Sequence, residues 1–189
     1  MKKILFLSVV IFFVCSGNAL AKPKNGFGLN VGATRNLMDS TYTTGTASNA
    51  LGSTESYTSS GVSLGIDYQI VFPKQLTLNP FLMISSESTS LASQAGAVMG
   101  HSILGLQGRL WQGDLFVGVH GGLYTETLSI SGGTSTTSES GSGQGLVVGW
   151  EPTNSRWSVM LQGDYATIKY PNQDVIWRGA RLSVGYRWK

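Results

Sequence analysis

The chain has 189 residues, of which 41% are hydrophobic and only 12% charged, and its formal net charge is +3. Two lysines belong to an N-terminal targeting segment, so +3 less 2 leaves +1 for the remainder. This balance excludes the strongly basic character of nucleic-acid-binding proteins. The single cysteine, Cys15, lies in the same segment, so the remainder can form neither a disulfide within the chain nor a cysteine metal site.

The first residues have the layout of a cleaved signal peptide. Two lysines precede the apolar run Ile4–Val14, which is too short for a comfortable membrane-spanning helix. The stretch Asn18–Ala21 then supplies the small residues of a cleavage site. We therefore predict a signal peptide at 1–21 and one domain at 22–189. Lipid attachment at Cys15 is the alternative, but the preceding valine is bulkier than lipoprotein processing usually tolerates.

Beyond the signal, apolar and polar residues alternate with a period of two, which indicates β-strands with one apolar face. The pattern is clearest in five stretches and weaker in three. Most are about ten residues long, enough to cross a bilayer at a tilt, and the sixth is shorter. In chain order the eight stretches are 27–37, 62–72, 76–85, 100–111, 115–126, 145–151, 157–167 and 181–189. A count of ten strands remains open if long connections contribute strands.

The connections between these stretches alternate in length. Long segments rich in Ser and Thr lie at 39–60, 86–98 and 128–144, whereas 73–75, 112–114 and 152–155 are short. Long outer loops and short periplasmic turns are the layout of outer-membrane barrels, and a soluble sandwich has no reason to keep it. We predict an all-β fold, a closed antiparallel up-and-down transmembrane β-barrel.

Aromatic residues gather at the strand ends that this topology places on the periplasmic side, where an interfacial belt is expected. The predicted belt consists of Phe27, Phe72, Trp111, Trp150, Trp157, Tyr186 and Trp188. The acidic residues of the predicted outer loops are Asp39, Glu55, Glu87, Glu139 and Asp174, whereas lysine and arginine gather on the opposite side. These signals agree on one orientation.

The closing stretch SVGYRWK alternates up to an aromatic residue, Trp188, which Lys189 follows. This stretch resembles the last strand of the small eight-stranded outer-membrane barrels, the OmpX, OmpA transmembrane-domain and opacity-protein type. The resemblance covers the whole mature chain. It implies a location in the bacterial outer membrane and a closing strand that the outer-membrane assembly machinery reads. Loops differ among such proteins, so the fold alone does not give the function.

An eight-stranded barrel is narrow, so its interior is expected to be filled by side chains. Strand parity places charged residues inside, where they must be paired. We predict that Asp164 pairs with Arg181 and that ion pairs plug the lumen; the alternative is a narrow pore. The inward charged or titratable residues are Asp67, Arg109, His120, Glu126, Glu151, Asp164, Arg181 and Arg187.

The sequence contains no recognisable catalytic, metal or cofactor motif, so none of these sites is predicted. A lipid A-modifying enzyme is a further alternative, for which His101 with Ser102, or His120, are the candidate residues. Neighbours on a strand point to opposite faces, however, so His101 and Ser102 cannot form a dyad. The expected role is that of a structural or surface-interaction protein whose outer loops meet an extracellular partner.

Two arginines follow the lipid-facing parity near the outer ends of the first and last strands. Arg35 and Arg178 would be costly at mid-membrane but are tolerated near an interface. Guanidinium groups bind phosphates well, and the outer leaflet presents lipopolysaccharide phosphates. We therefore expect a lipopolysaccharide contact at these residues, with simple snorkelling to the interface as the alternative.

Overall fold

The structure of the protein is a computed structural model that describes residues 23–45, 51–89, 97–130, 136–152 and 154–188. This part of the chain contains eight strands and one short 3₁₀ turn, Pro73–Gln75, and no helix long and apolar enough to span a bilayer. The strands are β1 (Gly26–Tyr42), β2 (Thr54–Val71), β3 (Leu76–Thr89), β4 (Ala97–Gln112), β5 (Leu115–Ile130), β6 (Thr136–Trp150), β7 (Trp157–Lys169) and β8 (Gln173–Trp188). The predicted signal peptide and Cys15 lie outside the described residues.

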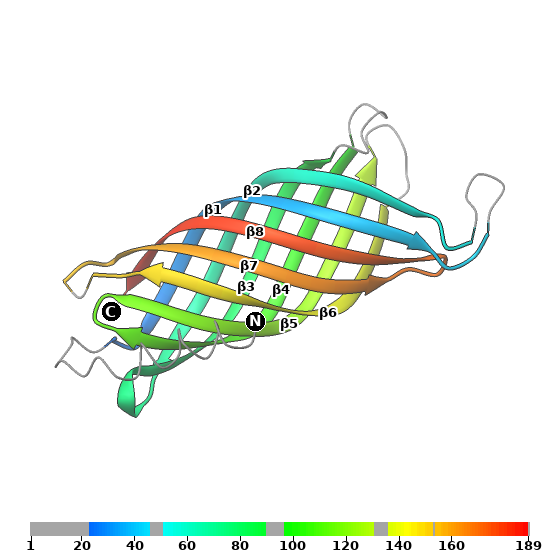
Figure 1. Cartoon of the computed structure of the whole chain (residues 1–189). Helices are drawn as coiled ribbons and strands as arrows, with labels where there is room; N and C mark the ends of the chain where they lie inside the picture. Colours follow the sequence, from blue (N-terminus) through cyan, green and yellow to red (C-terminus); the bar gives the residue numbers. More distant parts are fainter. Residues whose placement is uncertain (1–22, 46–50, 90–96, 131–135, 153, 189) are drawn as a thin grey trace.

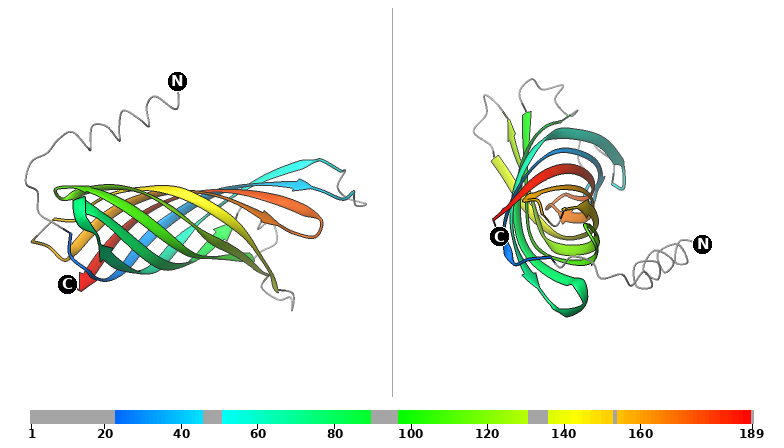
Figure 2. Two further views of the ribbon diagram at one scale, coloured as in Figure 1. Left: turned by 90° about the horizontal axis from the view of Figure 1, so that it is seen from below. Right: turned by 90° about the vertical axis from the view of Figure 1, so that its left-hand side faces the viewer.

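The strands form one closed antiparallel barrel in which each pairs with its neighbours in sequence order (Figure 1). The seam joins β1 to β8, from Phe27 opposite Trp188 to Tyr42 opposite Gln173. Seen from one end, the ribbon encloses a ring (Figure 2, right). Closure leaves no sheet edge, so the backbone is paired around the whole circumference. The predicted fold class is confirmed, with eight strands rather than ten.

The strands are longer than the sequence pattern predicted. β2 has 18 residues and β6 has 15, although the stretches 54–60 and 136–144 were expected to be loops. Their Ser- and Thr-rich segments are polar on both faces, so apolar periodicity could not reveal them, yet threonine suits a strand. On the loop side β2 and β6 therefore extend past the point where the apolar pattern stops. Figure 2, left, shows strand hairpins projecting from this end of the barrel.

The middle of the outer surface is a band of large apolar side chains. Val31, Leu104, Leu146 and Leu182 are each 55–61% exposed, and similar residues occur on every strand. Toward the long connections the outward positions become serine and threonine, such as Ser60 and Ser88 in β2 and β3. A continuous exposed apolar ring of this kind requires lipid as its solvent, so the strands span a membrane.

Six of the seven predicted belt residues face outward at the end that holds the short turns and the C-terminus. Phe27, Phe72, Trp150, Trp157 and Trp188 are 42–59% exposed. Tyr186 lies between two tryptophans, with ring-centroid distances of 5.1 Å to Trp157 and 5.0 Å to Trp188. The rings form the interfacial cluster expected at the edge of an apolar band.

The seventh predicted belt residue, Trp111, is a correction. It is only 4% exposed because it faces the lumen, where its indole nitrogen donates to Thr77 at 3.0 Å. Its ring also packs against Phe116, with centroids 4.7 Å apart. The sequence places two apolar residues in succession at the end of β4, and the outward one is Leu110. Trp111 therefore closes the barrel from inside.

An arginine in the apolar band should destabilise the barrel far more than one beyond it. Val31 pairs with two other lipid-facing residues, Leu64 and Val184. We expect Val31→Arg to lower the free energy of unfolding in vesicles by about 2–4 kcal/mol, and Ser88→Arg by about 0–1 kcal/mol. Urea titrations followed by tryptophan fluorescence measure both. Equal losses would contradict the position of the band.

Candidate functional site

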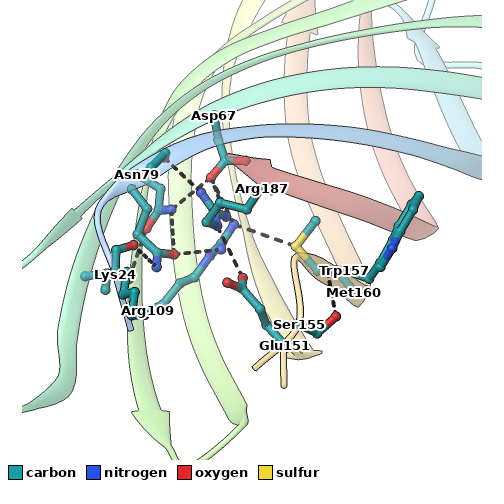
Figure 3. Close-up of polar contacts among 12 residues, drawn as sticks. Lys24, Asp67, Asn79, Arg109, Glu151, Ser155, Trp157, Met160 and Arg187 are labelled. Atoms are coloured by element: carbon teal, nitrogen blue, oxygen red, sulfur yellow. Dashed lines mark hydrogen bonds and ion pairs between the residues drawn. The ribbon is translucent and has the colours of Figure 1, made fainter. Parts of the chain in front are cut away.

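The lumen contains charged side chains from six strands and the β6–β7 turn, arranged in layers along the barrel axis. The layer nearest the short turns centres on Asp67 of β2 (Figure 3). Its carboxylate accepts hydrogen bonds from Arg187, Asn30 and Asn79, each at 3.0 Å, and Arg109 lies 3.8 Å away. Asp67 is 4% exposed and therefore depends on these partners.

Arg187 and Arg109 connect this carboxylate to the rest of the layer. Arg187 Nε lies 3.3 Å from Glu151, and another nitrogen donates to the Gly26 carbonyl at 3.1 Å. Arg109 donates to Gln107 at 2.5 Å, and its guanidinium lies 4.6 Å from the centroid of Phe116. Two arginines and two carboxylates thus balance each other in a layer that closes this end of the lumen.

The middle layer contains the pair that sequence parity had brought together. Arg181 lies 3.7 Å from Asp164, on neighbouring strands β8 and β7. The same carboxylate lies 2.7 Å from His120 and accepts a hydrogen bond from the Tyr124 hydroxyl at 2.9 Å. The shorter contacts of Asp164 therefore reach β5 over Gly145, the residue of β6 that pairs with both His120 and Asp164. Sequence reasoning missed them because they depend on the register of three strands.

The layer nearest the loops centres on Glu87, which the sequence had placed in an outer loop. The assignment was wrong, because Glu87 lies in β3 and is only 2% exposed in the lumen. It accepts hydrogen bonds from Asn36 at 2.6 Å and Thr34 at 3.0 Å, as well as from Ser59. His101 lies 3.3 Å from Glu87 and 3.7 Å from Glu126. Sequence reasoning had left His101 without a partner.

An apolar cluster fills the lumen around and above this layer, although the interior was expected to be polar. Trp177 stacks on His101 with ring centroids 5.2 Å apart and contacts Tyr124 edge-on at 5.1 Å. The buried cluster comprises Met38, Tyr57, Met83, Met99, Ile103, Tyr124, Ala166, Ile168, Val175 and Trp177. An internal cavity of about 40 Å³, lined by residues that include Asp67, Arg109 and Arg181, has room for only a few waters.

The candidate catalytic residues do not assemble into a reaction centre. His101 faces the lumen and is 4% exposed, while the neighbouring Ser102 faces outward. His120 is equally buried and is held by Asp164, Tyr124 and Gln162. Among the described residues, no group of three or more His, Cys, Asp or Glu side chains could hold a metal ion.

The two outward arginines lie side by side at the loop-side edge of the apolar band. Arg178 pairs with Asp39 at 2.7 Å, and the Ser56 hydroxyl donates a hydrogen bond to the same carboxylate at 2.6 Å. Arg35 is exposed, and no described residue forms an ion pair with it. The structure therefore leaves one unneutralised guanidinium at the membrane edge.

Buried and exposed ion pairs should differ sharply in their contribution to stability. We expect Asp67→Asn to lower the free energy of unfolding by about 3–5 kcal/mol, because it leaves Arg187 and Arg109 buried with too little negative charge. Asp39→Asn should leave stability close to wild type, because Arg178 is 49% exposed and solvated without its partner. Chemical unfolding in vesicles compares the two, and similar losses would contradict the ion-pair network.

Comparison with known proteins agrees with this geometry. No protein-family model and no curated protein sequence matches the chain significantly. Among solved structures, Neisserial surface protein A covers 85% of this chain and 97% of its own, at 13% identity and a TM-score of 0.52. The attachment invasion locus protein Ail of Yersinia pestis covers 88% and 100%, at 11% identity and a TM-score of 0.50. OprG of Pseudomonas aeruginosa covers 89% and 98%, at 12% identity and a TM-score of 0.50.

The closed eight-stranded sheet, the exposed apolar band and the aromatic belt define a small outer-membrane β-barrel protein. It has the fold of Ail, Neisserial surface protein A and OprG, the last of which is an outer membrane protein. At these low identities the comparison concerns architecture, so the role of the barrel has to be argued from its own residues.

Proposed function

We propose that this barrel is a surface-interaction protein whose loop-side rim meets an extracellular partner, as adhesion and opacity proteins do. The observation that carries the proposal is the contrast between a packed lumen and an ordered, exposed rim. The three polar layers and the apolar cluster occupy the interior, which leaves little room for transport. Residues 1–21 would be removed as a signal peptide, leaving the barrel domain at 22–189.

The rim is held together by hydrogen bonds between neighbouring hairpins. The Thr43 amide donates to the Asn172 carbonyl at 2.9 Å, and the Thr44 hydroxyl donates to the Asn172 side chain at 3.2 Å. The Tyr42 hydroxyl donates to Glu55 at 3.2 Å. The two bonds to Asn172 connect the β1–β2 hairpin to the β7–β8 turn, and the Tyr42 bond joins the two strands of the first hairpin. Together they hold a polar surface in place on this part of the rim.

The composition of the rim favours a partner that is bound through hydrogen bonds rather than charge. The stretches 43–53, 90–96 and 131–135 contain no charged residue. The acidic Asp39, Glu55 and Asp174 lie nearby, so the surface lacks the basic patch that a sulfated polymer needs. One structure of Ail is a complex with the heparin analogue sucrose octasulfate. We propose a different, neutral class of partner here, such as an uncharged glycan.

Removal of the rim hairpin should abolish attachment without unfolding the barrel. We would replace residues 42–53 by Asn-Gly, a two-residue hairpin turn, next to the pair Thr41 and Thr54. Cells carrying this variant should bind surfaces coated with neutral glycans no better than cells without the protein. Wild-type attachment should survive a rise from about 0.1 M to about 1 M salt, because it does not depend on charge.

Lys24→Gln, at the opposite end of the barrel, is the control and should attach like wild type. Undiminished attachment of the shortened hairpin would contradict a role for the rim. Attachment to heparin that falls with salt would instead favour a charged partner.

The alternatives are a narrow pore and a lipid A-modifying enzyme, and both are less well supported. A pore requires a continuous path, whereas Trp111, Trp177 and the ion-pair layers fill the lumen. An enzyme requires an accessible nucleophile or base, whereas His101 and His120 are buried. Discrete conductance steps in planar bilayers would favour the pore, and an altered lipid A mass in cells with the protein would favour the enzyme.

We further propose that Arg35 and Arg178 contact lipopolysaccharide phosphates, and that the C-terminal strand is read by the outer-membrane assembly machinery. The unneutralised Arg35 at the membrane edge supports the first contact. The double variant Arg35→Ala/Arg178→Ala should therefore co-purify with less lipopolysaccharide than wild type, measured per barrel by mass spectrometry. Arg156→Ala, on the opposite side, is the matched control. If the double variant co-purifies with as much lipopolysaccharide as wild type, the arginines make no phosphate contact and only extend to the membrane interface.

A further inference from the structure

We infer that the outer wall over β5–β8 contains a seat for one acyl chain of lipid A. The inference rests on the proposed lipopolysaccharide contact and extends it to the lipid's hydrocarbon part. The wall has a groove of about 500 Å³, within the size range of small-molecule sites. Its outward-facing lining residues are Val119, Gln144, Leu146, Gly163 and Tyr165.

The groove exists because an outward position lacks a side chain. Gly163 of β7 pairs with Leu146 of β6 on one side and with Ala180 of β8 on the other. A Cβ placed on Gly163 would meet no atom within 4 Å. Val119, Leu146 and Tyr165 are 44–55% exposed around this gap, so their side chains form walls of apolar surface. The groove lies in the apolar band, where only lipid can enter it.

A polar side chain within the band indicates that the occupant also has polar atoms. Gln144 points outward opposite Gly121, which lies between the apolar, lipid-facing Val119 and Leu123. Among the described residues the Gln144 amide has no hydrogen-bond partner, although such groups are costly in hydrocarbon. The acyl linkages of lipid A carry carbonyl and amide groups that the Gln144 amide could bind.

The arginines border the same groove on its β8–β1 side. Arg178 pairs with Tyr165 across β7–β8, and Ala180 lies between Gly163 and Arg35 in the next row of the sheet. Arg35 has no ion pair with a described residue, so its charge is available to an anion. A phosphate there and an acyl chain over Gly163 would belong to one molecule. The groove at Gly163 thus has an amide on its β6 side and cations on its β8–β1 side, which match the polar linkages and the phosphates of lipid A.

Filling the groove tests the seat without removing the arginines. The full-length barrel would be placed in phosphatidylcholine nanodiscs and titrated with purified lipid A, with binding measured by native mass spectrometry. Gly163→Leu should weaken lipid A binding about tenfold, because leucine occupies the seat. Gly108→Leu is the matched control: Gly108 is outward-facing and equally open, but it lies outside the groove lining. It should bind within about twofold of wild type.

Two comparisons separate the seat from the phosphate contact. If Gly163→Leu binds like wild type, or loses no more than Gly108→Leu, the acyl seat is wrong, even if Arg35→Gln/Arg178→Gln binds poorly. Poor binding by Gly163→Leu supports the acyl seat. If the arginine variant still prefers phosphorylated over dephosphorylated lipid A, as wild type does, the assignment of the phosphate to the arginines is wrong. The cooperative unfolding of every variant is recorded, so that misfolded protein is not counted as lost binding.

Discussion

Closure of the hydrogen-bonded ladder is the constraint on which the rest of this molecule depends. A bilayer offers no water to unpaired amides and carbonyls, so a sheet within it has to close on itself. The seam between β1 and β8 completes the ring, and it explains why the chain keeps an alternating, aromatic strand to its last described residue. Closure also forces every second side chain into a narrow interior.

The interior solves two problems at once, since it has to be filled and every buried charge has to be paired. Asp67 with Arg187 and Arg109, and Asp164 with His120 and Arg181, neutralise charges that come from separate strands. The apolar cluster around Trp177 occupies the space nearer the loops. A lumen packed in this way gives a rigid support and leaves the two ends and the outer wall as the surfaces that can bind other molecules.

The outer surface is accordingly where function is best sought. On the loop side, hydrogen bonds between the hairpins fix a rim that is polar but nearly free of positive charge. On the lipid side, a missing side chain at Gly163 and two neighbouring arginines break the uniform apolar band. A protein that only anchored itself in the membrane would need neither feature. The rim faces a partner in the medium, and the groove with its arginines faces a partner in the membrane.

The sequence alone determined the class of the fold, the strand parity in the apolar band and most of the aromatic belt. Because one face of each strand meets lipid and the other meets the packed lumen, apolar and polar residues alternate with a period of two along the strand. This alternation is local, so the sequence itself shows it. Only the tertiary structure decided that Glu87 and Trp111 face inward, how far the Ser- and Thr-rich strands extend, and that Asp164 reaches His120. Strand ends polar on both faces carry no such signal, and contacts between strands that are not direct neighbours depend on the register of the sheet. The register also brings Arg35, Arg178 and Gly163 together from three strands, a neighbourhood that no stretch of sequence contains.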